Sequence, residues 1–502
     1  MNPPFHLSKS RFLRGVQCHK HLYLHLRRPD LEPEIDPEGQ AVLDEGIRVG
    51  EFARTLFPGG LLIPHGEESL KKTGEALRSP AQSIFEGTFL YDDVYVKADI
   101  LERSSESTAW DLIEVKSSQS LKEEHLWDLA VQAHVIKGSG LPVGRIILMY
   151  INSDCTHPNL HKLFSCADVT EEVTKLLPKI PLVLSEIKKM LQEDHPPKLD
   201  IGPHCHTPRE CPFVQHCWQH VPTFSIFDLY RIPPEKAWEL YRGGTLSITD
   251  CKPTGNDIAS RMIEVEKTKR RFVDRAKIRE TLAEWRWPLY FLDFETVNPA
   301  IPRFPGTHPR EQVPFQFSCH IQKSRGTGLV HSGYLHPDDT DPRKALAESL
   351  FASIGDEGCV VAYNKKFEAE CLVHLARAMP SFSTKVQSIL RRLVDPLPVM
   401  RSAVYDRNFF GSFGLKSVAL ALLGSEGDYS SLEIQDGRMA QIYFAEMVKD
   451  TTPEERNLEL REALIRYCAQ DTLVLAGLLD WMLREIGEDL SEKQSSQAGE
   501  KL

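Results

Sequence analysis

Residues 287–296 read Trp-Pro-Leu-Tyr-Phe-Leu-Asp-Phe-Glu-Thr, and this stretch decides the fold of the second half of the chain. A mainly apolar run of this length is typical of a buried β-strand, and here two carboxylates follow it directly. Successive side chains of a strand point to opposite faces, so Asp293 and Glu295 share one face. We therefore predict a strand that presents two carboxylates to a divalent metal ion.

The pattern around this strand predicts an α/β domain. Apolar and β-branched runs predict further strands, and helical periodicity follows them. The expected strands are 289–297, 313–322, 329–335 and 359–363. The expected helices are 343–353, 368–378, 415–423 and 455–486. The polar tail, residues 488–502, is expected to be disordered.

Two later segments bring further acids. Glu368 stands at the start of a predicted helix, directly after a strand end. Tyr467 and Asp471 are four residues apart in a long helix and therefore share a face. Phosphodiester hydrolysis uses two divalent ions held by several carboxylates, and a tyrosine hydroxyl can orient the attacking water. The sequence thus predicts a Mg²⁺ or Mn²⁺ centre made of Asp293, Glu295, Glu368, Tyr467 and Asp471.

These motifs resemble those of the DnaQ-like 3′–5′ exonucleases, which have the RNase H-like fold, in the subgroup whose last motif is Tyr-x-x-x-Asp. The resemblance covers about residues 286–487. The matching positions are Asp293 and Glu295 in the first motif, 364–368 in the second, and Tyr467 and Asp471 in the third. The family's second motif normally ends in Asp, and Glu368 is longer by one methylene, which can change the metal spacing or the rate.

Other interpretations of these residues remain open. The acids can instead cap helices and pair with arginines, or the fold can have lost activity and serve as a nucleic-acid-binding module. The departure at Glu368 is the best support for a decayed site. The same four acids also serve RNA exonucleases. Asp395 is either a further acid of the site or a helix cap.

The first half of the chain predicts a second metal site on a β-hairpin. Residues 95–101 alternate like a strand, and a polar turn separates them from the strand at 110–116. Glu114 and Lys116 share a face, and Asp99 is expected on the neighbouring antiparallel strand. A metal between the two acids, with a lysine that positions water or stabilises the pentavalent phosphate, makes a hydrolytic site. The alternative is a surface hairpin of mixed charge.

The hairpin resembles the PD-(D/E)XK nucleases of the RecB-like branch. The matching positions are Asp99, Glu114 and Lys116. Gln132, in a helix expected over 126–136, stands where that branch often carries a glutamine. Segment 46–51 resembles the upstream helix of the branch, in which Glu51 either completes the ligand set or is a solvated acid.

A cysteine cluster ends the first half. Cys205, Cys211 and Cys217 are evenly spaced among Pro and His residues, which is not a core pattern, and Cys18 is the candidate for a fourth ligand. Thiolates suit both iron–sulfur clusters and zinc, so zinc and unligated thiols remain alternatives. RecB-like nucleases of the CRISPR-adaptation and recombination-repair types resemble this arrangement, and the resemblance implies a 4Fe-4S cluster. Those families mostly space the late trio as C-x2-C-x5-C, whereas both spacings are x5 here.

Length predicts the domain organisation. A chain of 502 residues is too long for one hydrophobic core, and we predict domains at 1–220 and 286–487 joined by a helical connector at 221–285. The connector has a basic face, which is either a solvated surface or a track for a phosphate backbone. Its cations are Lys267, Lys269, Arg270, Arg271, Arg275, Lys277 and Arg279.

Charge and hydropathy limit the function classes. The net charge of −11 argues against a protein that coats nucleic acid by bulk attraction, but it permits a local basic groove. Cations near the start that could contact phosphates are Lys9, Arg11, Arg14 and Lys20. No apolar stretch reaches the roughly 20 residues of a membrane span, and the start has no apolar signal region. We therefore expect a cytoplasmic protein without a membrane partner.

The whole chain resembles an uncharacterised bacterial family that fuses an iron–sulfur RecB-like nuclease to a DnaQ-like exonuclease through a helical linker. The resemblance implies a metal-dependent nuclease that acts on DNA, with single strands or DNA ends as its partner. Protein partners and the physiological pathway do not follow from the residues.

Overall fold

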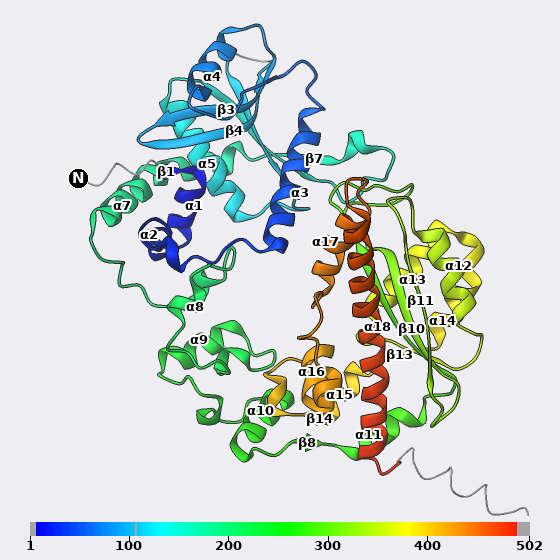
Figure 1. The fold of residues 1–502 in the computed structure, drawn as a ribbon. Helices are drawn as coiled ribbons and strands as arrows, with labels where there is room; N and C mark the ends of the chain where they lie inside the picture. The colour runs from blue at the N-terminus through cyan, green and yellow to red at the C-terminus, as the bar shows by residue number, and fades with distance from the viewer. Residues whose placement is uncertain (1–6, 106–107, 489–502) are drawn as a thin grey trace, which may run out of the picture. The chain divides into compact units, whose positions relative to one another are not determined.

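The structure is a computed structural model that describes residues 7–105 and 108–488. It is a mixed α/β protein whose chain forms two compact units (Figure 1). Unit 1 comprises residues up to 220 together with 299–311, and unit 2 comprises 221–298 and the residues from 312 onward. No helix in the described part of the chain combines the length and the apolar character needed to cross a membrane.

Unit 1 is built on a seven-stranded mixed sheet with the order β2-β3-β4-β5-β6-β7 and with β1 beside β4. The strands are β1 Leu7–Ser8, β2 Leu61–Leu62, β3 Ser83–Tyr91, β4 Val94–Arg103, β5 Trp110–Lys116, β6 Val143–Ile151 and β7 Phe164–Asp168. Strands β3, β4 and β5 are antiparallel neighbours, whereas β5 and β6 are parallel. The predicted hairpin at 95–101 and 110–116 therefore corresponds to β4 and β5.

The α-helices of unit 1 include one that is largely buried, α5. They are α1 Lys9–Gln17, α2 His19–Arg27, α3 Pro37–Arg54, α4 Ser69–Arg78, α5 Glu123–Gly138, α6 Thr170–Leu176, α7 Ile180–Gln192 and α8 Val214–Cys217. Helix α5 contacts β3, β4 and β6 on one side and α1 and α6 on another. A helix that is covered on all sides must be apolar over most of its surface, and the stretch 129–136 is apolar except at Gln132 and His134.

Part of the connection between two strands of unit 2 belongs to unit 1. The Arg310 guanidinium lies 2.6 Å from the Glu45 carboxylate, which also accepts a hydrogen bond of 2.9 Å from the backbone N–H of Ala300. Ala300 is itself buried with Val49 and Ile151 of unit 1. Residues 299–311, which the sequence placed in the second domain, therefore pack as a component of the first.

Unit 2 contains a five-stranded sheet with the order β11-β10-β9-β12-β13. Its strands are β9 Leu289–Val297, β10 Val313–Gln322, β11 Leu329–Leu335, β12 Cys359–Val361 and β13 Leu393–Val394. Strand β10 is antiparallel to β9 and β11, whereas β12 is parallel to both β9 and β13. The first three strands have the predicted bounds, and β12 ends two residues earlier than predicted.

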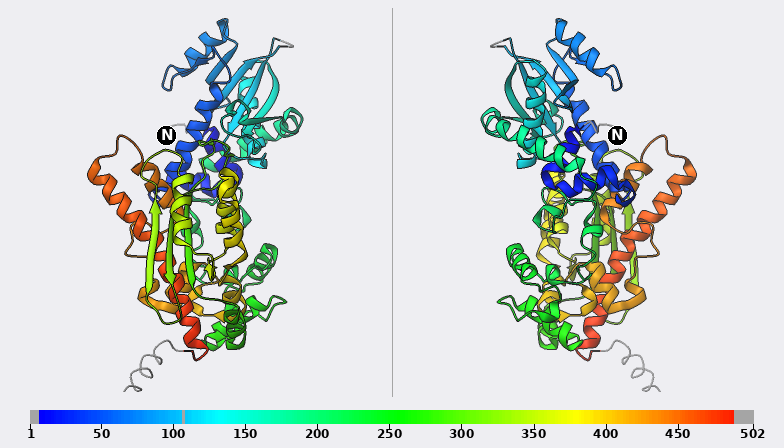
Figure 2. Two further views of the ribbon diagram at one scale, coloured as in Figure 1. Left: turned by 90° about the vertical axis from the view of Figure 1, so that its right-hand side faces the viewer. Right: turned by 90° about the vertical axis from the view of Figure 1, so that its left-hand side faces the viewer.

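Helices cover both faces of this sheet. They are α12 Arg343–Ser353, α13 Lys366–Ala378, α14 Ser383–Arg391, α15 Leu397–Ala403, α16 Leu415–Leu423, α17 Gly437–Met447 and α18 Glu454–Glu485. Leu292 and Phe294 of β9 pack against α12 and α13, whereas Phe291 packs against α18. Figure 2 shows α18 along one side of the strands and the yellow helices α12 and α13 along the other. The β9 face that carries Asp293 and Glu295 is thus the face that meets α18.

The segment predicted as a connector is integrated into unit 2. It forms α9 Pro234–Arg242, α10 Asp257–Thr268, β8 Phe272–Val273 and α11 Arg275–Ala283, and β8 pairs with β14 Val404–Tyr405. Its apolar residues share one core cluster with α15 and α18. Its cations pair within the unit, as Arg271 does with Asp406 at 2.6 Å and Arg275 with Glu485 at 2.9 Å. Residues 221–285 and most of 286–487 thus pack together in unit 2. The predicted tail lies outside the described residues from 489 onward.

Gly358, just before β12, stands at a position where a side chain would clash with the main chain. Its φ is +79°, and a Cβ atom there would lie 1.9 Å from the carbonyl oxygen of Pro288. We expect Gly358→Ala to lower the free energy of unfolding by about 3 kcal/mol or more, because it adds backbone strain and a clash with the main chain. Gly328→Ala, where a Cβ meets nothing within 4 Å, is the matched control in urea denaturation. Equal stability of the two variants would contradict this packing.

Candidate metal centres

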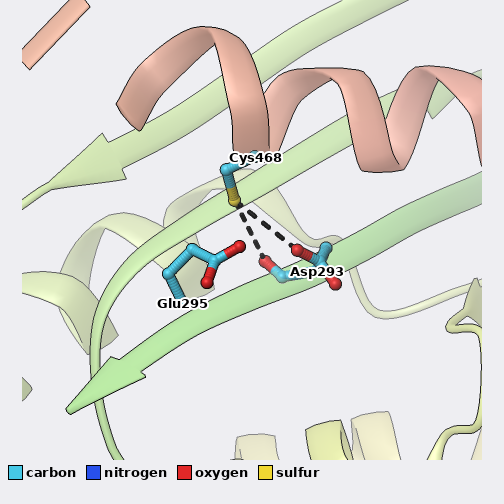
Figure 3. Close-up of side chains that lie close together, drawn as sticks. All are labelled: Asp293, Glu295 and Cys468. Carbon is cyan, nitrogen blue, oxygen red and sulfur yellow. Dashed lines mark hydrogen bonds between the residues drawn. The ribbon is translucent and has the colours of Figure 1, made fainter. Parts of the chain in front are cut away.

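The first centre lies in unit 2, where β9 faces α18. Asp293, Glu295 and Cys468 each offer a ligand atom, and these three atoms all lie within 4.8 Å of one another. The Cys468 sulfur is 3.7 Å from Asp293 Oδ2. Figure 3 shows the two carboxylates rising from one strand toward the thiol on the helix above it. The strand alternation that placed both acids on one face is therefore observed, and a cysteine joins them that the sequence did not single out.

Asp471 and Tyr467 of α18 are held by residues from other elements. Tyr429 donates a hydrogen bond of 2.6 Å from its hydroxyl to Asp471 Oδ1. Lys416 of α16 donates from its Nζ to the Tyr467 hydroxyl oxygen at 3.0 Å. Sequence reasoning missed both Tyr429 and Lys416, because neither stands in a local motif. Only the packing of their segments against α18 brings them to the site.

Glu368 lies in the first turn of α13 and is buried, with 3% of its surface exposed. Its negative charge is one of those that raise the pKa of Asp293, so the two carboxyl groups are near neighbours. Glu368 Oε2 is buried, and among the described residues it has no hydrogen-bond partner. A buried oxygen of this kind costs free energy unless it binds something, and a cation is the partner that a carboxylate oxygen accepts best.

Asp395 acts as a cap of the loop that precedes Glu368. Its carboxylate accepts hydrogen bonds from the backbone N–H groups of Asn364 at 2.9 Å, Lys365 at 3.3 Å and Leu397 at 2.9 Å. Asn364 has a φ of +61°, a conformation that asparagine tolerates better than most residues. Of the two roles open to Asp395, the structure thus shows the capping role.

The carboxyl groups of this centre carry strongly perturbed pKa values. Burial, followed by the charges of Asp471, Glu295 and Glu368, raises the pKa of Asp293. Burial and the charge of Asp471 likewise raise the pKa of Glu295. Burial raises the pKa of Glu368 to about 8 and that of Asp471 to about 6, although the Tyr429 hydrogen bond and the Lys416 charge oppose the latter shift. Four carboxyl groups, three of whose charges act on the fourth, Asp293, make a donor set that fits divalent cations.

The second centre lies in unit 1 around Glu114 of β5, which is 1% exposed. Its Oε1 accepts hydrogen bonds from Lys116 Nζ at 2.6 Å and from Lys9 Nζ at 2.8 Å. Its Oε2 accepts one from Gln132 Nε2 at 2.7 Å. The structure thus brings the predicted Glu114, Lys116 and Gln132 together. It adds Lys9, which the sequence had assigned to phosphate contact.

Asp128 is a further member of this centre that sequence reasoning missed. It accepts from Lys116 at 2.6 Å and from Gln132 at 3.0 Å, and it lies 3.2 Å from Lys9 Nζ. Asp128 precedes Gln132 by one turn of α5, so the spacing of four residues was an available signal.

Asp99 lies on β4 opposite Glu114 of β5. The antiparallel register pairs Ile100 with Ile113, and Asp99 and Glu114 are the next residues along the two strands. Asp99 Oδ2 accepts a hydrogen bond of 2.8 Å from the Val115 backbone N–H. Burial and the Glu114 charge raise the pKa of Asp99 to about 7. Burial acts on Glu114 too, but the ammonium groups of Lys116 and Lys9 outweigh it and lower the pKa of Glu114.

Other predicted residues face elsewhere. The Glu51 side chain is 60% exposed, and it pairs with Arg54 at 3.8 Å on its own helix. Arg14 lies 3.1 Å from His25 Nε2, and Lys20 lines the cysteine pocket described next. The solvated alternative for Glu51 is therefore the one observed.

The four predicted cysteines line one pocket of unit 1. Cys18 caps the C-terminus of α1, and the other three come from 205–217. Burial raises the pKa values of Cys18 and Cys217, and it raises that of Cys211 to about 12.

Comparison with known proteins adds one match. The family described as a domain of unknown function (DUF2779) matches residues 290–414. The matched segment contains Asp293, Glu295 and Glu368, whereas Tyr467 and Asp471 lie beyond its end. No curated protein matches the chain.

Glu368 should make the metal-free protein less stable as the pH rises. Its pKa is raised in the folded chain, so between its ordinary pKa and about 8 the unfolded chain loses the proton first and unfolding is favoured. We expect Glu368→Gln to raise the free energy of unfolding by about 2–4 kcal/mol more at pH 8 than at pH 5, as a pKa shift of this direction requires. Denaturant titrations with chelator measure this difference.

Glu370→Gln is the matched control, because Glu370 lies on the same helix with half of its side chain exposed. A pH-independent difference between the two variants would show that Glu368 is not buried with a raised pKa.

Proposed function

We propose that this protein is a metal-dependent nuclease that hydrolyses phosphodiester bonds of DNA, with a 3′–5′ exonuclease centre in unit 2 and a second nuclease centre in unit 1. The observation that carries the proposal is the convergence in unit 2 of acids from distant parts of the chain. Asp293, Glu295, Glu368 and Asp471 come from a strand and two helices, and their charges act on one another within a buried site. A fold that only needed stability would not collect four acids there.

The donor set suits hard divalent cations such as Mg²⁺ or Mn²⁺. Asp293, Glu295, Glu368 and Asp471 would hold them, and the unpaired Glu368 Oε2 is an oxygen that such an ion would satisfy. Bound there, two divalent ions activate water and stabilise the negative charge that builds up on the leaving oxygen. The family match covers three of these acids but assigns them no activity.

The chain's own residues supply the remaining functions. The Tyr467 hydroxyl accepts a hydrogen bond from Lys416 and lies beside Asp471, where it would help to orient a water molecule bound at the site. The Tyr429 hydrogen bond fixes one oxygen of Asp471, and α18 positions Tyr467 and Asp471 one helical turn apart. The strand order of the unit 2 sheet, antiparallel on one side of β9 and parallel on the other, supports an RNase H-like fold.

The unit 1 centre supports a PD-(D/E)XK nuclease of the RecB-like type. Asp99 and Glu114 stand side by side on antiparallel strands, and Lys116 and Gln132 both contact Glu114. Lys116 carries a positive charge at a place where a phosphate would gain negative charge during hydrolysis.

We further propose that Cys18, Cys205, Cys211 and Cys217 hold a 4Fe-4S cluster, with zinc as the alternative. The support is a set of four thiols that line one pocket, since four thiolates are the usual ligands of such a cluster. A cluster there would link the end of α1 to the loop 205–217 and would limit the unfolded chain by closing a long loop.

Removal of one carboxylate tests the exonuclease centre. We expect Asp293→Ala to slow 3′–5′ trimming of 5′-labelled single-stranded DNA in Mn²⁺ by about 100-fold or more without unfolding the protein. The reason is that a proposed ligand of the divalent cation, which stabilises the charge of the transition state, is lost. Glu370→Ala, an exposed acid on α13, serves as the control, and chelator serves as the blank. Trimming by Asp293→Ala at the wild-type rate would contradict the proposal. The variant Asp99→Ala tests the unit 1 centre separately. RNA of the same sequence, used as substrate, tests the substrate class.

The cysteine pocket has its own test. We expect the wild-type protein to be brown and to contain iron and acid-labile sulfide, whereas Cys211→Ala should lose the colour and melt at a lower temperature, since binding free energy of the cluster is folding free energy. Cys166→Ala, an exposed thiol of β7, should change neither property. A colourless wild-type protein that contains zinc would replace the cluster with a zinc site.

A further inference from the structure

Two ammonium groups occupy the unit 1 centre, although the nuclease motif accounts for only one. Lys116 shares its strand with Glu114, two residues away. Lys9 comes from the first position of α1, 105 residues away in sequence. Both donate to Glu114 Oε1, and both lie within ion-pair distance of Asp128. Lys9 is therefore an additional member of the centre and needs an explanation of its own.

The position of Lys9 is set by the acids and not by its helix. A lysine in the first turn of a helix lies near the positive end of the helix dipole, which disfavours its charge. Its side chain is nevertheless only 23% exposed and points to two acids that are almost fully buried. The attraction of Glu114 and Asp128 outweighs both the helix dipole and the desolvation of the ammonium group.

A divalent cation at this centre would meet that ammonium group directly. Glu114 Oε1 already accepts from both lysines, and its Oε2 accepts from Gln132. An ion bound between Asp99 and Glu114 would add two positive charges beside two existing ones. Lys116 stands two residues from Glu114 on the same strand, so its backbone stays beside that acid. Lys9 reaches in from another element on a flexible four-carbon stem and can withdraw.

We propose that Lys9 competes with the divalent cation for Glu114, so that binding of the cation requires Lys9 to leave. The inference rests on the proposed metal-dependent function of this centre. It makes Lys9 a positioning residue that keeps the acids paired before the cation arrives, in place of the phosphate contact predicted from the sequence.

Helix α1 links this competition to the cysteine pocket. The helix begins at Lys9 and ends at Gln17, and Cys18 is its C-terminal cap. Gln17 Nε2 donates to the carbonyl oxygens of His204 at 2.9 Å and Arg209 at 2.7 Å, both in the loop that carries the late cysteines. A nine-residue helix transmits a shift at one end to the other as a nearly rigid body. Loosening the Gln17 contacts should therefore weaken the hold of Lys9 on Glu114.

Titration of Mn²⁺ into the full-length protein tests this competition without any need for activity. The Asp293→Ala, Glu295→Ala double variant serves as background, so that only the unit 1 centre is read by calorimetry and by the electron paramagnetic resonance of free Mn²⁺. We expect Lys9→Met to tighten Mn²⁺ binding by about tenfold or more, because a competing charge is removed. Lys9→Arg, which keeps the charge, should stay within about twofold of the background.

The matched control is Lys188→Met, which removes a lysine of unit 1 that pairs with Asp92 and Asp93. It should leave the Mn²⁺ affinity unchanged. An unchanged or weaker affinity in Lys9→Met, with a circular dichroism spectrum and melting curve like those of Lys188→Met, overturns the inference. A further substitution, Asp99→Ala, in the background should abolish the remaining Mn²⁺ binding. If it does not, or if the background binds no Mn²⁺, the proposed function of the centre fails instead.

Gln17→Ala tests the link through α1. It should tighten Mn²⁺ binding in the chain that retains Lys9. Added to Lys9→Met, it should leave the Mn²⁺ affinity unchanged, since the two substitutions act through one side chain. An equal change in both chains overturns the link.

Discussion

Unit 2 depends on the burial of like charges at one place. Asp293, Glu295 and Asp471 raise one another's cost of ionisation, and Glu368 adds to it from α13. Lys416, the tyrosine hydroxyls, the Cys468 thiol and a backbone hydrogen bond to Glu368 oppose this cost. The surrounding sheet and helices must therefore hold the acids together against their repulsion. A cation that binds there would remove this repulsion, and the relief would add to its binding free energy.

The two centres solve the same electrostatic problem in opposite ways. In unit 1, each oxygen of Glu114 and of Asp128 accepts from Lys9, Lys116 or Gln132, and the pKa of Glu114 is lowered. In unit 2 the acids outnumber their cations, and their pKa values are raised. The lysines of unit 1 neutralise the acids of their centre, whereas the acids of unit 2 keep a net negative charge that a cation could neutralise. The two centres should therefore differ in metal affinity and in its dependence on pH, even if both perform the same reaction.

Much of the candidate site could be predicted, because it is written in local patterns. The alternation at Asp293 and Glu295, the spacing of Tyr467 and Asp471 and the apolar run of β9 each depend on residues close in sequence. Cys468 and Asp128 stood next to these patterns and were overlooked, whereas Tyr429 and Lys416 carried no local signal at all. The packing of segment 221–285 carried no local signal either, since Arg271 finds its partner Asp406 only after the chain has folded.

Local periodicity in the sequence was enough to predict the long strands and helices of unit 2 and the shared face of Asp293 and Glu295, since it depends only on near neighbours. Which faces meet depends on the folded chain. Tertiary packing placed Cys468 over Asp293, brought Lys9 to Glu114 across 105 residues and joined residues 299–311 to unit 1. These outcomes arise from the packing of apolar surfaces and the pairing of buried charges, both of which act between segments that are far apart in the chain.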